Sequence, residues 1–229
     1  MTEAVSERGF FLTIEGIDGC GKSTQAAMMR EWLEKMRPSG AGRAILSTFE
    51  PGDWSGGALL RRLLLEPQEN FPMTDRTELL LFLADRSGHL DTKIVPALEA
   101  GRTVICERYN DSTLAYQSWG RGLPREDIEK IFEGCRFPIP DATVLLDIDA
   151  GTARERLRRR GVPDRMESGG RDFMERVVRG YRELAAGYPE RIVVIDASGE
   201  VEQVAERIRK ALCARLEACC PQREQEKNP

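Results

Sequence analysis

The stretch from Gly16 to Thr24, GIDGCGKST, combines three glycines, one lysine and two hydroxyl side chains. It matches the pattern G-x-x-x-x-G-K-[ST] and lies between an apolar run and a helical pattern, as a phosphate-binding loop requires. Backbone N–H groups and the positive end of the following helix would surround phosphate oxygens. We expect Lys22 to reach the β- and γ-phosphates of a nucleoside triphosphate and Ser23 to bind Mg²⁺. The alternative is a chance glycine turn.

Charged residues also follow the apolar runs that read as neighbouring strands. Glu15 ends the first run, Glu50-Pro51-Gly52 follows the second and Glu107-Arg108-Tyr109 follows the third. Each could be a solvated turn. Because ligands of an open parallel sheet bind outside the carboxyl ends of its strands, we expect all three to lie at the edge that carries the glycine loop.

Two features indicate an acceptor pocket. Phe82 and Arg86 are four residues apart and therefore share one helix face, where a ring can stack on a base and a guanidinium can hydrogen bond to its edge. The alternative is a core phenylalanine with an arginine beside it. Arg108 directly follows a predicted strand and could bind a phosphate monoester with two hydrogen bonds, or form a surface ion pair.

An arginine-rich segment, RERLRRRGVPDR, runs from Arg154 to Arg165 in a chain with a net charge of −4. Such a run usually forms a solvated helix face. Gly161 and Pro163 could bound a moving segment, so we interpret residues 156–171 as a lid that closes arginines over phosphates.

Short apolar runs alternate with helical patterns along the chain, which predicts an α/β fold: a doubly wound, parallel, five-stranded sheet flanked by helices, with the arginine-rich lid. The predicted strands are 10–15, 44–49, 103–106, 142–148 and 191–195. The predicted helices are 22–36, 57–65, 74–98, 125–133, 152–160, 172–186 and 201–216. We expect one domain over residues 1–216 and a polar C-terminal tail over 217–229.

Composition narrows the functional classes. The net charge of −4 argues against a nucleic-acid partner, and the first residues contain no apolar run suited to a signal peptide or a membrane span. Six cysteines without a C-x-x-C pair indicate reduced thiols and a cytoplasmic location. A single histidine, His89, disfavours histidine metal sites and Ser-His-Asp catalysis. No Asn/Thr-Lys-x-Asp motif of a GTPase is present.

Taken in order, the motifs resemble the thymidylate kinase family. The resemblance runs from FFLTIEGIDGCGKST through EPG, LLFLADR, ERYNDSTLAYQ, GRG and PDATVLLDID to RRRGVPDRMES and YRELA. It implies a homodimer that uses Mg²⁺ to transfer the γ-phosphate of ATP to dTMP, giving dTDP and ADP for dTTP synthesis.

The resemblance also implies roles for individual residues. Asp18 would lie near the sugar and acceptor phosphate, Phe82 would stack on thymine, and Tyr116 would crowd the 2′ position. The implied catalytic residues are Lys22, Arg108, Arg158 and Arg160. The implied nucleotide-phosphate site is Gly16, Ile17, Asp18, Gly19, Cys20, Gly21, Lys22, Ser23 and Thr24. The implied substrate site is Asp18, Glu50, Pro51, Phe82, Arg86, Arg108, Thr113, Tyr116 and Gln117, and the implied metal ligands are Ser23, Glu107 and Glu167.

The chain departs from the family pattern at several positions. Phe49 stands where many bacterial relatives carry arginine, Asp53-Trp54 replaces Gly-Thr, Glu107 replaces an aspartate and Met166 replaces an aromatic residue. Two alternatives stay open from the sequence. One is another nucleoside-monophosphate or deoxynucleoside kinase, and the other is a non-catalytic nucleotide-binding switch.

Overall fold

Five parallel strands in the order β2-β3-β1-β4-β5 form the centre of the computed structural model, which describes residues 8–36, 44–66, 73–159, 166 and 170–219. Each strand agrees with its predicted range to within one residue at either end. The strands are β1 (Phe11–Glu15), β2 (Ile45–Phe49), β3 (Thr103–Glu107), β4 (Ala142–Asp147) and β5 (Ile192–Asp196).

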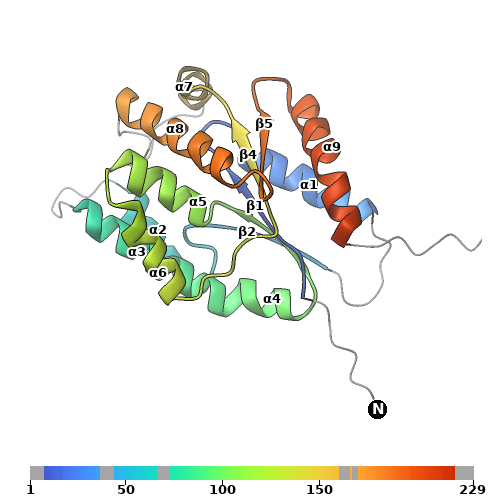
Figure 1. Cartoon of the computed structure of the whole chain (residues 1–229), viewed down its shortest axis with the longest axis horizontal. Helices are drawn as coiled ribbons and strands as arrows, with labels where there is room; N and C mark the ends of the chain where they lie inside the picture. The colour runs from blue at the N-terminus through green and yellow to red at the C-terminus, as the bar shows by residue number, and fades with distance from the viewer. Residues whose placement is uncertain (1–7, 37–43, 67–72, 160–165, 167–169, 220–229) are drawn as a thin grey trace, which may run out of the picture.

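The helices cover both faces of this sheet. In Figure 1, α1 and α9 lie on one side, and α5, α8 and the α2–α3 pair lie on the other. Burial on both faces explains why the three central strands, β1, β3 and β4, read as continuous apolar runs rather than as alternating ones. The helices are α1 (Lys22–Met36), α2 (Gly57–Leu65), α3 (Asp75–His89), α4 (Val95–Glu99), α5 (Asn110–Thr113), α6 (Arg125–Gly134), α7 (Ala150–Arg158), α8 (Arg171–Gly187) and α9 (Val201–Cys219).

Strand register places the predicted charged residues together. Glu107 lies opposite Ile14 of β1 on one side and opposite Phe49 of β2 on the other. The backbone N–H of Glu50 donates to the carbonyl of Glu107 at 2.9 Å, and that of Arg108 donates to the carbonyl of Ile14 at 3.0 Å. The expectation that Glu15, Glu50 and the Glu107-Arg108 pair share one edge is therefore confirmed.

The predicted helix 74–98 is interrupted. Thr74 is the N-cap, whose hydroxyl accepts a hydrogen bond from the N–H of Thr77, and a π-helical turn, η1 (Leu90–Ile94), separates α3 from α4. Pro96 lies in the first turn of α4. Proline lacks an N–H and its ring collides with the carbonyl four residues earlier, so the preceding turn widens to accommodate it.

One helical segment was not predicted. α5 continues into a second π-helical stretch, η2 (Leu114–Gly120). Its sequence, NDSTLAYQSWG, is rich in residues with weak helix propensity. Long-range contacts hold it: the carboxylate of buried Asp111 receives two hydrogen bonds from the guanidinium of Arg191, at 2.6 and 2.8 Å, and Ser112 bonds to Glu15.

The other boundaries move slightly. α7 starts at Ala150 because Asp149 caps it, accepting from the N–H of Thr152 at 2.9 Å, and it ends at Arg158. α9 extends to Cys219, past the expected start of the tail. None of the helices in the described ranges is long and apolar enough to cross a lipid bilayer.

We expect Asp111→Ala to lower the free energy of unfolding by about 3 kcal/mol, because the largely buried guanidinium of Arg191 loses the carboxylate that receives two of its hydrogen bonds. Urea-induced unfolding followed by circular dichroism measures the change. Glu175→Ala is the control, since its partner Arg171 is exposed and the pair lies on the surface of α8. Equal stability of the two variants would contradict this account of how α5 is held.

Candidate active site

The glycine loop between β1 and α1 encloses the ammonium group of Lys22. Lys22 is 8% exposed, and its Nζ donates to the carbonyls of Gly16 and Ile17 at 3.0 Å each and lies 3.6 Å from Oδ1 of Asp18. Gly16 and Gly21 have φ values of +137° and +100°, which side-chain-bearing residues rarely adopt. The loop that the pattern predicted is therefore formed, with its lysine inside it.

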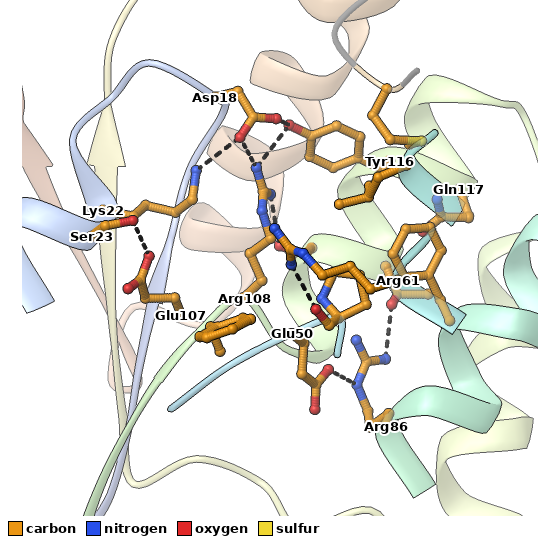
Figure 2. Close-up of a pocket in the computed structure, with 17 residues that line it drawn as sticks. Asp18, Lys22, Ser23, Glu50, Arg61, Arg86, Glu107, Arg108, Tyr116 and Gln117 are labelled. Carbon is orange, nitrogen blue, oxygen red and sulfur yellow. Dashed lines mark hydrogen bonds and ion pairs between the residues drawn. The ribbon is translucent and has the colours of Figure 1, made fainter. Parts of the chain in front are cut away.

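A cavity of about 290 Å³ opens beside this loop at the carboxyl edge of the sheet (Figure 2). Lys22, Ser23 and Glu107 line one part of it. All the substrate-binding residues implied by the resemblance also line it: Asp18, Glu50, Pro51, Phe82, Arg86, Arg108, Thr113, Tyr116 and Gln117. Segments far apart in sequence thus converge on one space, although their individual roles stay predictions.

Asp18, Arg108 and Tyr116 form a charged group in this cavity. Nη2 of Arg108 donates to Oδ1 of Asp18 at 2.6 Å, the hydroxyl of Tyr116 donates to Oδ2 at 3.3 Å, and the guanidinium lies 5.1 Å from the centre of the Tyr116 ring. Burial opposes ionisation of Asp18, but the charges of Arg108 and Lys22 hold its pKa well below its ordinary value. Two cations therefore flank one carboxylate, which leaves a positive balance for an anionic ligand.

Arg108 has a strained backbone. Its φ of +64° is in the left-handed region, which an arginine rarely adopts. Such strain persists where surrounding contacts over-determine it, and it gathers at functional sites. Here the Arg108 N–H is bound by β1 and the side chain by Asp18, so the turn after β3 directs the guanidinium into the cavity.

Arg86 lies at the floor of the cavity and is only 2% exposed. Its Nε donates to Oε2 of Glu50 at 2.7 Å, its Nη1 donates to the hydroxyl of Thr113 at 2.8 Å, and its guanidinium lies 5.1 Å from the ring centre of Tyr109. Arg86 is thus enclosed by specific partners, while Phe82 packs against the hydrophobic core, and the role of the pair in binding a base stays a prediction. Phe82, one turn earlier on α3, lines the same cavity.

Ser23 and Glu107 provide oxygen atoms beside Lys22. The hydroxyl of Ser23 donates to Oε2 of Glu107 at 2.7 Å. Hydroxyl and carboxylate oxygens are the donors that Mg²⁺ prefers, so these two residues fit the predicted metal. The third predicted ligand, Glu167, lies outside the described residues.

A second cavity, of about 380 Å³, adjoins the loop through Gly19, Cys20 and Gly21. The start of α1 lines it with Thr24 and Gln25, and so does the segment 197–201 after β5. The side-chain amide of Gln25 donates to the carbonyl of Val201 at 2.9 Å and ties the two walls together. Sequence reasoning missed this segment, whose one signal is its position after the last strand.

The described arginines of the arginine-rich segment do not all face the second cavity. Arg156 lines the second cavity, whereas Arg158 is exposed at the end of α7, and Arg160 lies outside the described residues. Gly19 cannot gain a side chain without moving α7, because a Cβ there would lie 2.5 Å from the carbonyl oxygen of Ala153. α7 therefore packs directly against the loop, which brings Arg156 to it.

Sequence reasoning also missed Arg61, which extends from α2 into the first cavity. Its Nη1 donates to the carbonyl of Pro51 at 2.6 Å, and its guanidinium lies 5.2 Å from the ring centre of Phe49. The Glu50–Pro51 peptide bond is cis. Phe49, which stands where many bacterial relatives carry arginine, thus contacts an arginine of α2. Arg61 is followed by Arg62, and nothing local in the sequence distinguishes the two.

A buried carboxylate, Glu15, supports the cavity from below. It accepts hydrogen bonds from the N–H of Tyr109 at 2.7 Å, the hydroxyl of Ser112 at 2.5 Å and the hydroxyl of Tyr181 at 3.1 Å. Burial raises its pKa from 4.5 to about 7, and the charge of Asp111 adds to the rise, whereas the hydrogen bond from Ser112 opposes it. Glu15 therefore ties the backbone of Tyr109, next to Arg108, to α5 and α8 through its hydrogen bonds.

Comparisons with known proteins agree on one family. The family model described as "Thymidylate kinase" matches residues 14–208. The thymidylate kinase of Nostoc punctiforme is 41% identical over 210 residues, which cover 91% of this chain and 97% of that protein. The thymidylate kinase of Alkalilimnicola ehrlichii is 42% identical over 90% of this chain and 94% of that protein. The crystal structure of thymidylate kinase from Ehrlichia chaffeensis superposes with a TM-score of 0.73 at 30% identity, covering 90% of this chain and 99% of that one.

The raised pKa of Glu15 predicts a pH dependence of stability. Between about pH 5 and 7 the folded protein keeps a proton on Glu15 that the unfolded chain releases, so the free energy of unfolding decreases as the pH rises through that window. We expect Glu15→Gln to remove this decrease, which is about 3 kcal/mol at most. Urea unfolding at several pH values measures it.

Glu31→Gln is the matched control, because Glu31 is exposed on α1. If the pH dependence of Glu15→Gln followed that of this control and of the parent chain, the raised pKa would be wrong.

Proposed function

The chain belongs to the thymidylate kinase family, and from that premise we propose which of its residues perform the reaction. The chain transfers the γ-phosphate of ATP to dTMP, with Mg²⁺ as cofactor, and produces dTDP and ADP. The observation that supports our residue assignment is the convergence of the predicted acceptor residues on one cavity next to Lys22.

The first cavity is the proposed dTMP site. Arg108 would bind the monophosphate, because it is already held by Asp18 at the mouth of the loop. Arg61 brings a second guanidinium to the same cavity. Phe82 would stack on thymine, and Arg86 would hydrogen bond to its edge from the cavity floor. Tyr116 and Gln117 would border the sugar and the base.

The second cavity is the proposed site of the ATP base and ribose, since it lies along the glycine loop and faces the segment 197–201. The β- and γ-phosphates would then lie over the loop, at Lys22. Ser23 and Glu107 would hold Mg²⁺, which neutralises phosphate charge when bound. Lys22 now donates to loop carbonyls, so bound phosphate would have to replace those bonds.

Little acid–base chemistry is required, because the attacking group is an anionic phosphate oxygen. The work of the chain is positioning and charge neutralisation. The loop contains no arginine, so the guanidinium for the transferring phosphoryl group must come from elsewhere. We propose Arg158 and Arg160 of the lid for that group and assign Arg156 to the donor nucleotide.

We propose a single kinase domain over residues 1–216 that acts as a cytoplasmic homodimer. α2 and α3 pack against each other and expose apolar side chains: Leu59 is 71% exposed and Leu80 is 54% exposed. A soluble monomer rarely exposes neighbouring large apolar side chains, and a two-fold axis would bury them against the same patch of a second copy.

Turnover with ATP, Mg²⁺ and a panel of nucleoside monophosphates tests the site. We expect dTMP to be preferred over dCMP, dGMP and AMP. Lys22→Ala should abolish nearly all turnover, because its charge faces the transferring group. Phe82→Ala should weaken dTMP binding by about 1–3 kcal/mol, the value of one stacked base.

A folded Lys22→Ala variant with near-normal turnover would refute the assignment of the loop. A preference for a purine would move the acceptor assignment to a related kinase.

Arg156 and Arg158, both on α7, should differ in effect. Arg156→Ala should raise the KM for ATP about 10-fold, as loss of one charge-assisted hydrogen bond does, whereas Arg158→Ala should lower kcat about 100-fold or more at saturating substrate. Steady-state kinetics separates the two effects. Arg159→Ala is the control, because Arg159 is exposed and pairs with Glu155 at 2.7 Å. Identical kinetics of all three variants would contradict both assignments.

Leu80→Glu should convert the protein to a monomer in sedimentation velocity, because it would bury a carboxylate in the proposed interface. Ile139→Glu is the control, since Ile139 is 73% exposed and lies outside α2 and α3. A Leu80→Glu variant that sediments as the parent chain does would place the interface elsewhere.

A further inference from the structure

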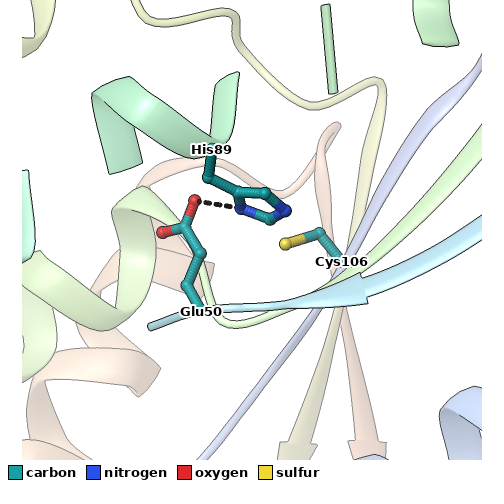
Figure 3. A group of neighbouring side chains, drawn as sticks. All are labelled: Glu50, His89 and Cys106. Atoms are coloured by element: carbon teal, nitrogen blue, oxygen red, sulfur yellow. Dashed lines mark hydrogen bonds and ion pairs between the residues drawn. The ribbon is translucent and has the colours of Figure 1, made fainter. Parts of the chain in front are cut away.

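His89, the only histidine of the chain, ends α3 behind the floor of the first cavity and is fully buried. Its Nδ1 lies 3.1 Å from Oε1 of Glu50, and its Nε2 lies 2.6 Å from the hydroxyl oxygen of Thr48. Figure 3 shows the ring between Glu50 and Cys106. Nothing in the proposed reaction uses this histidine, yet both of its nitrogens are engaged.

The contacts extend on both sides of the ring. The hydroxyl of Thr48 also donates to Oδ2 of Asp53 at 2.6 Å, and Oδ1 of Asp53 pairs with Nζ of Lys93 at 2.8 Å. On the other side, Oε2 of Glu50 accepts from Nε of Arg86 at 2.7 Å. A continuous polar chain therefore joins partly exposed Lys93 to the guanidinium at the cavity floor.

The donors along this chain can be counted. Thr48 has one proton, and it goes to Asp53, because Asp53 is a carboxylate paired with Lys93. Burial opposes ionisation of Asp53, but the hydrogen bonds from Lys93 and Thr48 keep its pKa low. The oxygen of Thr48 can then only accept, so Nε2 of His89 must carry a hydrogen.

The same reasoning applies to the other nitrogen. Glu50 accepts a hydrogen bond from the guanidinium of Arg86 at one oxygen, and the other carboxylate oxygen, which faces His89, can only accept as well. Nδ1 of His89 must therefore also carry a hydrogen. Both ring nitrogens then donate, one to Glu50 and the other to the hydroxyl of Thr48, which in turn donates to Asp53.

We propose that His89 is a positioning residue that donates from both ring nitrogens and holds Glu50 against Arg86, so that the guanidinium is fixed for the acceptor base. The proposal rests on the proposed role of Arg86 in dTMP binding. With Glu50 bonded at one oxygen to each cation, its carboxylate cannot rotate, and Nη1 of Arg86 stays directed at Thr113.

The other groups that face the ring agree with this state. The thiol of Cys106, on β3, donates to the carbonyl of Arg108 at 3.2 Å, and burial raises its pKa well above the ordinary value, so it is neutral. Asp85, on α3, is occupied by the N–H of Gly52 at 2.9 Å and the indole of Trp54 at 2.8 Å. Glu50, His89 and Cys106 lie close enough to hold a metal ion, but a doubly protonated ring has no lone pair to offer one.

The ring protons can be observed directly, because a single histidine gives one set of ¹⁵N ring resonances. We expect both ring nitrogens of the free enzyme to carry a hydrogen at pH 7, because each of them faces an acceptor oxygen. A neutral ring with one unprotonated nitrogen at pH 7 would overturn the proposal. This measurement needs no substrate, so it does not depend on the role of Arg86.

Kinetics tests the consequence. His89→Leu should raise the KM for dTMP about 10-fold, the effect of losing one hydrogen bond to a charged group, with kcat and the KM for ATP changed far less. Thr48→Ser keeps the hydroxyl that His89 contacts and should retain the parent KM for dTMP, whereas Thr48→Val should raise it.

Equal effects of His89→Leu on both KM values and kcat would indicate a merely structural histidine and overturn the proposal. If Arg86→Ala itself left the KM for dTMP unchanged, the role of Arg86 would fail, while the ring-proton measurement would still decide the charge of His89.

Discussion

Pairing of buried charge at the carboxyl edge of the sheet is the constraint on which the rest of the molecule depends. Glu15, Glu50 and Glu107 each come at or directly after the end of a strand, and Arg86 and Arg108 face the same edge. An unpaired charge in such a place costs several kcal/mol, so each must have a partner. The segments that supply partners, α3 and the turn after β3, are thereby fixed in place.

Those partners are not equivalent. Glu50 is shared between Arg86 and His89, both of them buried, whereas Asp18 and Arg108 meet at the wall of an open cavity. The first pair is therefore suited to a fixed recognition surface. The second pair, with Lys22 beside it, keeps a positive balance that a phosphate group can complete. The strained backbone of Arg108 belongs to this second group, where directing a side chain matters more than stability.

The glycine loop borders two cavities, and it packs directly against α7. Gly19 lies against the backbone of α7, and Lys22 turns inward to the loop carbonyls. One cavity extends from the lysine toward α3, and the other extends along the loop toward the segment after β5. Lys22 and Ser23 line the first cavity, and Gly19, Cys20 and Gly21 of the same loop line the second, so one short loop borders both.

Features that depend on short stretches of the chain could be predicted before the fold was known. Apolar runs predicted all five strands, the spacing of glycines and lysine predicted the loop, and the strand-end rule predicted that Glu15, Glu50 and Arg108 meet. The strands, the loop and the shared edge could be predicted because period, spacing and turn chemistry act over a few residues. The substrate-binding residues that the family resemblance implied also line the first cavity.

Only the tertiary structure decided which distant side chains meet. The helical segment from Asn110 to Gly120 has weak local propensity and is held by Arg191 and Glu15. Arg61 and Arg156 each have other arginines close by in the sequence, and no local pattern distinguishes them. Only the packing of α2 and α7 shows that these two line the cavities. His89 read only as a lone histidine, and its donors and acceptors come from β2, from the loop after β2 and, through Glu50, from Arg86. Such pairings depend on strand order and helix packing, which no local pattern encodes.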